Sequence, residues 1–267
     1  MSSYAITGAS KGIGREFVRQ LAADPANTVL AIVRNPESPD ISELASNHPN
    51  VHVIKGDATD PKSILEAASA AAAVTGGKLD VLIHNSNAVD TATMSSNPTQ
   101  MPFDAQAIRA IFDPALSTGI YGGLWTTNAF LPLIEKGIQK KIVHISSAMA
   151  DLDLINKTGI SYAVAYSVAK AGMNVQIAKY AAELAPRGIK VLALSPGWVD
   201  TWDGEKPPQV LQAENVMLKQ FQAVEPELKG QIQPEESVRK SLQVIERLDD
   251  ETSGLLLSHN GDRATWL

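Results

Sequence analysis

Short runs of aliphatic and β-branched residues recur along the chain, and longer stretches with helical spacing of apolar residues separate them. Within each run the apolar residues are continuous, which is typical of strands that are buried on both faces of a parallel sheet. We expect seven such strands, at residues 4–7, 29–33, 51–55, 81–83, 141–145, 190–194 and 255–257. Seven strands alternating with helices predict an α/β fold built on one doubly wound sheet.

The segment 202–233 interrupts this alternation. It contains Asp203-Gly204-Glu205 and Pro207-Pro208, and the next helical stretch begins only at residue 234. Ligands of doubly wound sheets bind beyond the carboxyl ends of the strands, and this insertion follows the sixth strand at that edge. Two interpretations stay open, a substrate lid or a solvated surface loop. No repeat or linker divides the chain, so residues 1–267 are expected to form a single domain.

Composition and charge narrow the possible functions. The 267 residues are 44% hydrophobic, which is enough for a sizeable core and argues against intrinsic disorder. A net charge of −6 gives no basic field for nucleic acid or anionic membranes. The chain has no cysteine, and its five histidines lack metal-ligand spacing, so we expect no metal. His84, at the end of one predicted strand, and His144, within another, are interpreted as core residues.

Targeting signals are also missing from the sequence. No stretch approaches the roughly 20 apolar residues of a membrane span. The first residues lack the basic and apolar regions of a secretory signal. We therefore expect a cytoplasmic protein whose redox chemistry, if it has any, depends on a bound cofactor.

A glycine-rich turn follows the first strand. Residues 7–14 read Thr-Gly-Ala-Ser-Lys-Gly-Ile-Gly, and a helical pattern continues from there. Glycines let the backbone approach an anion, and a helix N-terminus offers free N–H groups and a positive dipole to a pyrophosphate. The spacing differs from both the G-x-G-x-x-G fingerprint and the P-loop. The turn favours a dinucleotide site over an ordinary strand-to-helix connection.

The residue after the second strand discriminates between cofactors. An acid there would accept hydrogen bonds from a ribose 2′-hydroxyl, whereas a cation accommodates a 2′-phosphate. Arg34 occupies this position, and Lys11 adds a second cation from the glycine turn. The pair favours NADPH over NADH, and the alternative is two solvated surface cations.

Tyr166 and Lys170 lie one helical turn apart, on the same face of a predicted helix. A phenol titrates near pH 10, so it is a poor proton donor or acceptor at neutral pH unless a cation stabilises the phenolate. Lys170 is placed to supply that cation. Upstream, the strand at 141–145 delivers the hydroxyls of Ser146 and Ser147 to the carboxyl edge of the sheet.

The glycine turn and the Tyr166/Lys170 pair resemble the short-chain dehydrogenase/reductase family over nearly the whole chain. The 19-residue gap from Ser147 to Tyr166 is similar to the sniffer-like carbonyl reductase branch. The resemblance implies a Rossmann-type domain in which Ser147, rather than Ser146, binds the substrate carbonyl. Asp57 resembles the adenine-contacting aspartate, and it could equally begin a turn. The implied cofactor-binding residues are Gly8, Ser10, Lys11, Gly12, Ile13, Gly14, Arg34, Asp57, Ala58, Asn85, Ser86, Tyr166, Lys170, Pro196, Val199 and Thr201.

Two positions depart from the family pattern. Asn87 stands where the family has a glycine, and asparagine tolerates a left-handed backbone better than most residues. Gly119 stands where the family has the asparagine of its proton relay, and glycine has no side chain to hold the relay water. Three explanations stay open: water helped by the hydroxyl of Ser117 or Thr118, slower proton delivery, or different chemistry.

The sequence therefore predicts NADPH-dependent reduction of a ketone or aldehyde, with Tyr166 as the general acid and a small carbonyl compound as substrate. The alternatives are imine or enone reduction, dehydration, or a non-catalytic NADPH sensor. Trp198 and Trp202 either pack in the core or flank an aromatic substrate. The resemblance also implies a homodimer or homotetramer, formed through helices near residues 122–134 and 161–185.

Overall fold

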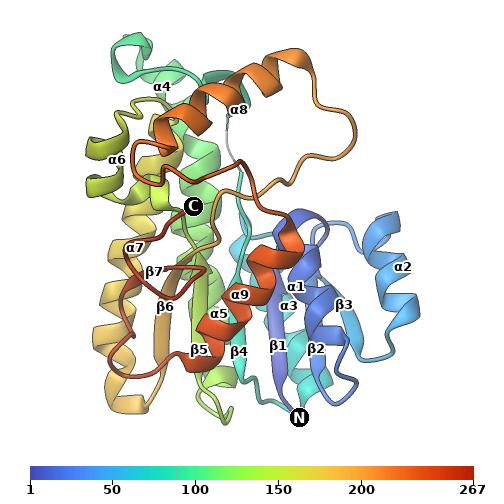
Figure 1. The fold of residues 1–267 in the computed structure, drawn as a ribbon. Coiled ribbons are helices and arrows are strands. Elements are labelled where there is room, and N and C mark those ends of the chain that lie inside the picture. The colour runs from blue at the N-terminus through green and yellow to red at the C-terminus, as the bar shows by residue number, and fades with distance from the viewer. Residues whose placement is uncertain (89) are drawn as a thin grey trace.

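The computed structural model describes residues 1–88 and 90–267. At its centre lies one sheet of seven parallel strands in the order β3-β2-β1-β4-β5-β6-β7 (Figure 1). The predicted α/β fold is confirmed, and the strand bounds differ from the predicted ones by one residue at most. The strands are β1 (Ser3–Thr7), β2 (Thr28–Val33), β3 (Val51–Lys55), β4 (Val81–His84), β5 (Lys141–Ile145), β6 (Lys190–Ser195) and β7 (Leu256–Ser258).

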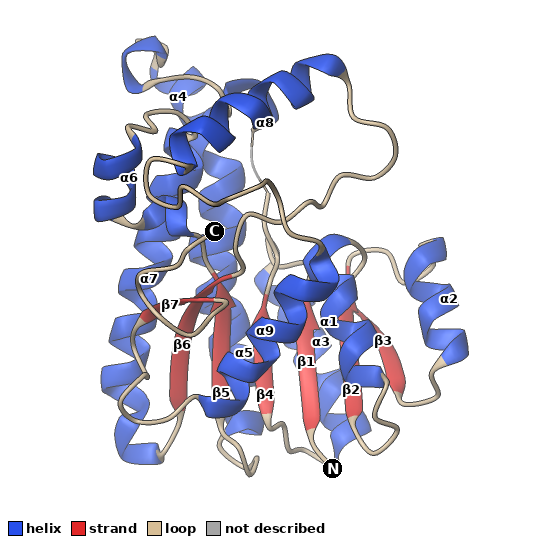
Figure 2. Cartoon of the chain, viewed as in Figure 1, coloured by secondary structure: helices blue, strands red, loops and turns tan. Residues whose placement is uncertain are grey.

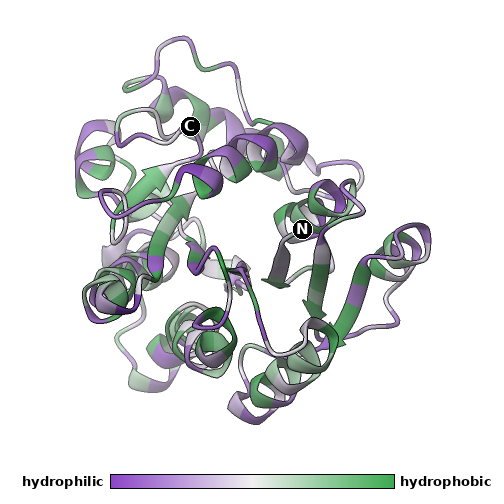
Figure 3. Cartoon of the chain, turned by 90° about the horizontal axis from the view of Figure 1, so that it is seen from below, coloured by the Kyte–Doolittle hydropathy of each residue, from purple (hydrophilic) through white to green (hydrophobic). Residues whose placement is uncertain are grey.

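Helices cover both faces of this sheet (Figure 2). One face packs against α3, α5 and α7, and the other against α1, α2 and α9. Hydrophobic residues concentrate on the strands, while the helices carry both kinds of residue (Figure 3). The helices are α1 (Gly12–Ala22), α2 (Pro39–Asn47), α3 (Pro61–Thr75), α4 (Ala105–Ala115), α5 (Gly122–Ile134), α6 (Leu152–Thr158), α7 (Val164–Leu184), α8 (Pro208–Phe221) and α9 (Pro234–Arg247).

The strand order reverses between β1 and β4, which are neighbours in the sheet although β2 and β3 separate them in the chain. The chain leaves β1 toward one edge of the sheet and leaves β4 toward the other. Such a reversal opens a crevice at the carboxyl ends of the two strands, where ligands of this kind of sheet bind. The fold therefore directs attention to the loops that follow β1 and β4.

The inserted segment crosses the same end of the molecule. Helix α8 lies above the carboxyl ends of the strands, and long loops flank it on both sides (Figure 1). An isolated parallel bridge between Val199 and Ile232 closes the base of the insertion. The segment therefore has the position of a lid and a helical element of its own.

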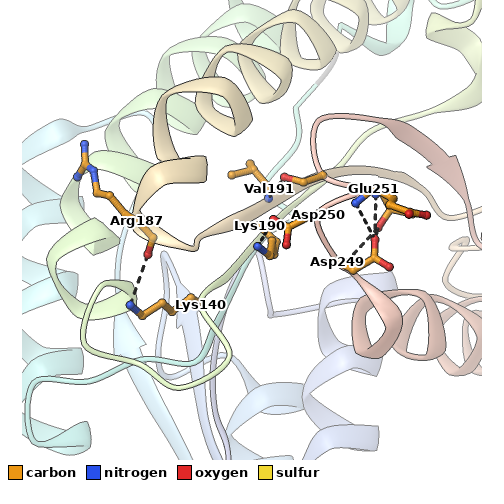
Figure 4. Close-up of polar contacts among 9 residues, drawn as sticks. Lys140, Arg187, Lys190, Val191, Asp249, Asp250 and Glu251 are labelled. Carbon is orange, nitrogen blue, oxygen red and sulfur yellow. Dashed lines mark hydrogen bonds and ion pairs between the residues drawn. The ribbon is translucent and has the colours of Figure 1, made fainter.

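Polar contacts fasten the opposite end of the sheet, away from the crevice (Figure 4). Lys190, the first residue of β6, pairs with Asp250. The Asp249 carboxylate accepts the backbone N–H of Glu251 at 3.1 Å, and the Ser253 hydroxyl accepts the N–H of Val191 at 3.0 Å. These bonds fix the turn that leads into β7.

Two features are absent from residues 1–88 and 90–267. Within them no helix is long and apolar enough to cross a membrane. The same residues contain no group of three or more His, Cys, Asp or Glu side chains arranged to hold a metal ion.

Candidate active site

Two adjoining cavities open at the carboxyl ends of the strands. The larger, of about 640 Å³, lies at the β1/β4 reversal, and the smaller, of about 360 Å³, lies beneath α8. Four residues line both cavities, so the two form a continuous site. These shared residues are Ile13, Asn85, Asn87 and Thr201.

The glycine turn forms one wall of the larger cavity. Gly8 has a φ of +65°, which favours glycine, and a Cβ atom built on Gly14 would lie 2.2 Å from the Gly8 carbonyl oxygen. The Asn85 side chain donates to that same oxygen at 3.2 Å. Thr7 Oγ1 in turn accepts the backbone N–H of Asn85 at 3.1 Å. The loop after β4 therefore holds the turn after β1 in place.

The cation-bearing end of this cavity fits a phosphate. Helix α1 begins after Lys11 with no capping side chain and no acidic residue in its first turn, so its N-terminal N–H groups are available. Arg34 lines the cavity with an exposed side chain. Asp57 also lines it, while its carboxylate accepts the backbone N–H of Thr59 at 2.9 Å. Both interpretations of Asp57 are therefore compatible with the geometry.

The smaller cavity brings together the three proposed catalytic side chains, Ser147, Tyr166 and Lys170. Tyr166 and Lys170 come from α7, and Ser147 follows β5. Lys170 Nζ lies 5.7 Å from the centroid of the Tyr166 ring and donates to the carbonyl oxygen of Ile145 at 2.7 Å. That bond anchors the long lysine side chain beneath the phenol.

Burial changes the acidity of both groups on α7. It raises the pKa of Tyr166, and a hydrogen bond with the Ser147 side chain opposes the increase. It also lowers the pKa of Lys170 to about 8. At neutral pH the phenol therefore keeps its proton, and most of Lys170 remains charged beside it. This is the protonation state that a general acid requires.

Supporting residues explain why Ser147, and not Ser146, is available to a ligand. Ser146 is buried and donates its hydroxyl proton to Asn174 Oδ1 at 2.6 Å. Ser147 Oγ accepts the backbone N–H of Met149 at 3.1 Å, and its other hydrogen bond is to the Tyr166 side chain, inside the cavity where a ligand would bind. Ser195 Oγ accepts the N–H of Ala148 at 2.9 Å and so fixes the turn that carries Ser147.

Gly119 lies in a six-residue π-helix, Leu116–Tyr121, between α4 and α5. Such widened turns are frequent at functional sites. A Cβ atom at Gly119 would meet a single neighbour, Met173 Cε at 3.5 Å, so there is open space beside it. The adjacent Thr118 bridges the helix to the loop after β4, because its Oγ1 accepts the N–H of Ala88 at 3.0 Å. A threonine hydroxyl, one of the expected substitutes, therefore contacts this loop.

The backbone at Asn87 does not use the left-handed conformation that asparagine tolerates. Among the described non-glycine residues, positive φ angles occur at Lys140 and Ala163. The replacement of glycine by Asn87 therefore costs no backbone strain at this turn. Its side chain is exposed and lines both cavities.

The predicted catalytic and cofactor-binding residues converge on these two cavities, with one exception. Gly14 lines neither and acts through its close contact with the Gly8 carbonyl. The predicted residues lining the larger cavity are Gly8, Ser10, Lys11, Gly12, Ile13, Arg34, Asp57, Ala58, Asn85, Ser86 and Thr201. Those lining the smaller one are Ile13, Asn85, Ser147, Tyr166, Lys170, Pro196, Val199 and Thr201.

Sequence reasoning missed other lining residues, which come from distant segments. Helix α4 brings Asp113 to the larger cavity, where Thr118, one of the two hydroxyls expected to replace the relay asparagine, also lies. Met94, Met217 and Gln231 line the smaller cavity. Met217 and Gln231 had one signal in the sequence, which is that both lie in the inserted segment 202–233.

Comparisons with known proteins agree with this geometry. The family model described as short chain dehydrogenase matches residues 3–207. The chain belongs to the short-chain dehydrogenase/reductase family. It is 43% identical to "Short-chain dehydrogenase/reductase atnB" of Arthrinium sp over 272 residues, covering all of both chains. It is 39% identical to "Short-chain dehydrogenase/reductase AacuF" of Aspergillus aculeatus, again over the full length of both.

Solved structures of this oxidoreductase family share the fold. A carbonyl reductase from chicken fatty liver, solved with bound NADPH, is 27% identical with a TM-score of 0.79, covering 100% of this chain and 99% of that one. The carbonyl reductase Sniffer of D. melanogaster is 21% identical with a TM-score of 0.78, covering all of both chains. The second likeness supports the fold alone.

Proposed function

We propose that this chain is an NADPH-dependent carbonyl reductase that reduces a ketone or aldehyde. The observation that carries the proposal is the convergence of Ser147, Tyr166 and Lys170 in a cavity that adjoins the proposed dinucleotide site. When bound, the nicotinamide supplies the hydride that the carbonyl carbon accepts. The NADPH-bound carbonyl reductase among its structural relatives supports this choice of cofactor.

Each residue of the site has one task in this reaction. Ser147 donates a hydrogen bond to the substrate carbonyl oxygen and so orients it. Tyr166 gives its proton to that oxygen as negative charge develops there. Lys170, anchored on the Ile145 carbonyl oxygen, places its positive charge near the phenol and stabilises the phenolate that remains.

Different parts of the two cavities would hold different parts of the cofactor. The N-terminus of α1 and the turn around Gly12 would hold the pyrophosphate. Arg34 and Lys11 would face a 2′-phosphate, which explains a preference for NADPH over NADH. Pro196, Val199 and Thr201 line the cavity that holds the catalytic groups and would contact the nicotinamide end.

The deciding experiment follows NADPH oxidation with an activated diketone in the wild type and in Tyr166→Phe. Removal of a general acid typically costs about 10²- to 10⁴-fold in rate, so turnover should fall by that amount while NADPH still binds. Arg34→Ala tests the cofactor preference. In this variant the KM for NADPH should rise and the KM for NADH should not. Full turnover by Tyr166→Phe refutes the mechanism, and tight NADPH binding without wild-type turnover favours a sensor.

The oligomeric state is proposed from the resemblance to the family. A homodimer or homotetramer would form through α5 and α7, because Tyr121, just before α5, and Val168 and Val175 on α7 are exposed apolar side chains. A cytoplasmic location is proposed as well. Sedimentation of the purified protein at several concentrations tests the first of these.

A further inference from the structure

Lys206, in the loop before α8, has unusually complete contacts for a lysine on the surface of a lid. Its Nζ lies 2.9 Å from Asp200 Oδ2, 2.7 Å from Glu214 Oε1 and 2.8 Å from Gln231 Oε1. An ammonium has three N–H donors, so all of them are used. The side chain is only 14% exposed. We call these four residues the Lys206 clasp.

The three acceptors come from separate segments, one before the insertion and two within it. Asp200 follows β6, Glu214 lies on α8, and Gln231 lies at the end of the segment beside the Val199–Ile232 bridge. Burial would lower the pKa of Lys206, but its bonds to Glu214 and Asp200 raise it, so the ammonium stays charged. The clasp therefore ties both ends of the lid to its helix.

The clasp also fixes how the Gln231 amide is oriented. A lysine can only donate, so the atom facing it is the amide oxygen. A backbone carbonyl can only accept, and the Val199 carbonyl oxygen lies 3.3 Å from Gln231 Nε2. These two partners allow a single orientation. One N–H of Nε2 has no acceptor within the described part of the chain, and Gln231 lines the substrate cavity. This N–H is the donor that Gln231 has left for a ligand of the cavity.

The surrounding wall is apolar. Met217 and Phe221 follow Glu214 on α8 at spacings of three and four residues, so the three share one face of the helix. Phe221 packs edge-on against Trp198, with ring centroids 5.2 Å apart. With Met149 on another side, these side chains enclose a cavity suited to a ring-bearing substrate.

We propose that Gln231, held as a donor by Lys206, is a specificity-determining residue that recognises a second oxygen on the substrate, away from the reacting carbonyl. The inference rests on the proposed carbonyl reduction. The substrate class is a ring-bearing, largely apolar aldehyde or ketone with an ether, hydroxyl or carbonyl oxygen as a hydrogen-bond acceptor. In this arrangement Lys206 is a positioning residue, because its own donors are all used.

The test uses pairs of benzaldehydes that carry a methoxy or an ethyl group at the ortho, meta or para position. Methoxy and ethyl match in shape, but only methoxy can accept a hydrogen bond. The quantity measured is the ratio of kcat/KM for the two members of each pair. Comparing this ratio between wild type and variants cancels the electronic effect of methoxy on the aldehyde.

Gln231→Leu removes the donor, and Lys206→Met releases the amide from its fixed orientation. In both, the methoxy preference of at least one isomer should fall by about 2- to 12-fold, the value of one net hydrogen bond. Lys219→Met is the matched control, because Lys219 is an exposed lysine of α8 that lies outside the clasp. It should keep the wild-type ratio. Loss of general lid structure would lower kcat/KM for both members of a pair and leave the ratio unchanged.

Binding is measured separately by quenching of tryptophan fluorescence with the same aldehydes. Binding that prefers methoxy and depends on Gln231, without turnover, overturns the proposed function and leaves the inference standing. Turnover without a methoxy preference, or a preference that survives Lys206→Met and Gln231→Leu, overturns the inference and leaves the function standing. Absence of both binding and turnover overturns both.

Discussion

The contact between Thr118 and the loop after β4 can be removed by a nearly isosteric change, Thr118→Val. In the wild type, Thr118 Oγ1 accepts the N–H of Ala88 at 3.0 Å and donates to the carbonyl oxygen of Pro114 at 2.9 Å. Valine keeps the branched shape and loses both bonds. The loop that it releases carries Asn85 and Asn87, which line both cavities.

The loss of stability in Thr118→Val follows from the Ala88 N–H, which is left without a hydrogen-bond acceptor. Thr118 is buried, and Ala88 is half-buried at the wall of the larger cavity, so water can replace the lost partner of the Ala88 N–H only in part. Leaving a buried donor unsatisfied costs about 1–3 kcal/mol of unfolding free energy. For a chain of this size, about 2 kcal/mol corresponds to a Tm lower by roughly 4–8 °C. We also expect a higher KM for NADPH, because Asn85 holds the glycine turn through the Gly8 carbonyl oxygen.

Thr126→Val on the next helix is the matched control. Thr126 is fully buried, and its hydroxyl has no hydrogen-bond partner among the described residues. Replacing this hydroxyl with a methyl group should leave Tm unchanged or raise it, because a buried unpaired hydroxyl is itself unfavourable. Thermal unfolding followed by circular dichroism compares the two variants. Equal Tm values for Thr118→Val and Thr126→Val would refute the assigned role of Thr118.

Two further predictions test the glycine turn and the buried histidines. Gly14→Ala should abolish NADPH binding, measured by calorimetric titration, because its Cβ would lie 2.2 Å from the Gly8 carbonyl oxygen. Gly119→Ala should keep or raise Tm, measured by thermal unfolding, because its Cβ meets one atom at 3.5 Å. Burial lowers the pKa of both His84 and His259 from 6.5 to about 4. As pH falls, these imidazoles are therefore protonated in the unfolded chain before they are protonated in the folded one. Each residue should therefore remove about 3 kcal/mol of stability between pH 6.5 and pH 4, and urea unfolding curves that do not shift across this window would contradict the prediction.

The sequence was sufficient for the fold because its signals are local. Each buried strand appears as a continuous apolar run, and the structure places all seven within one residue of the expected bounds. The catalytic pair could be predicted for the same reason. Tyr166 and Lys170 are four residues apart on one helix, so their proximity requires only that α7 forms.

Contacts between distant segments could not be predicted in this way. Lys206 and Gln231 are 25 residues apart, and their bond depends on how α8 lies over the strand ends. The π-helix at Gly119 is likewise invisible to periodicity, because a six-residue change of winding leaves the helical pattern around it intact. In each case the missing information is the tertiary position of a loop or helix, and spacing along the chain does not encode it.

Residues that the sequence predicts and residues that it does not predict also have different roles in the proposed reaction. The proton donor and the cation beside it lie within α7, and the glycine turn lies between β1 and α1, so short spacings in the sequence already indicate them. The groups that would select a substrate lie in the insertion, where the Lys206 clasp and the Trp198–Phe221 contact depend on the packing of the lid. Substitutions within 202–233 should therefore change which carbonyl compound is reduced, whereas substitutions at Tyr166 or Lys170 should change whether any is reduced.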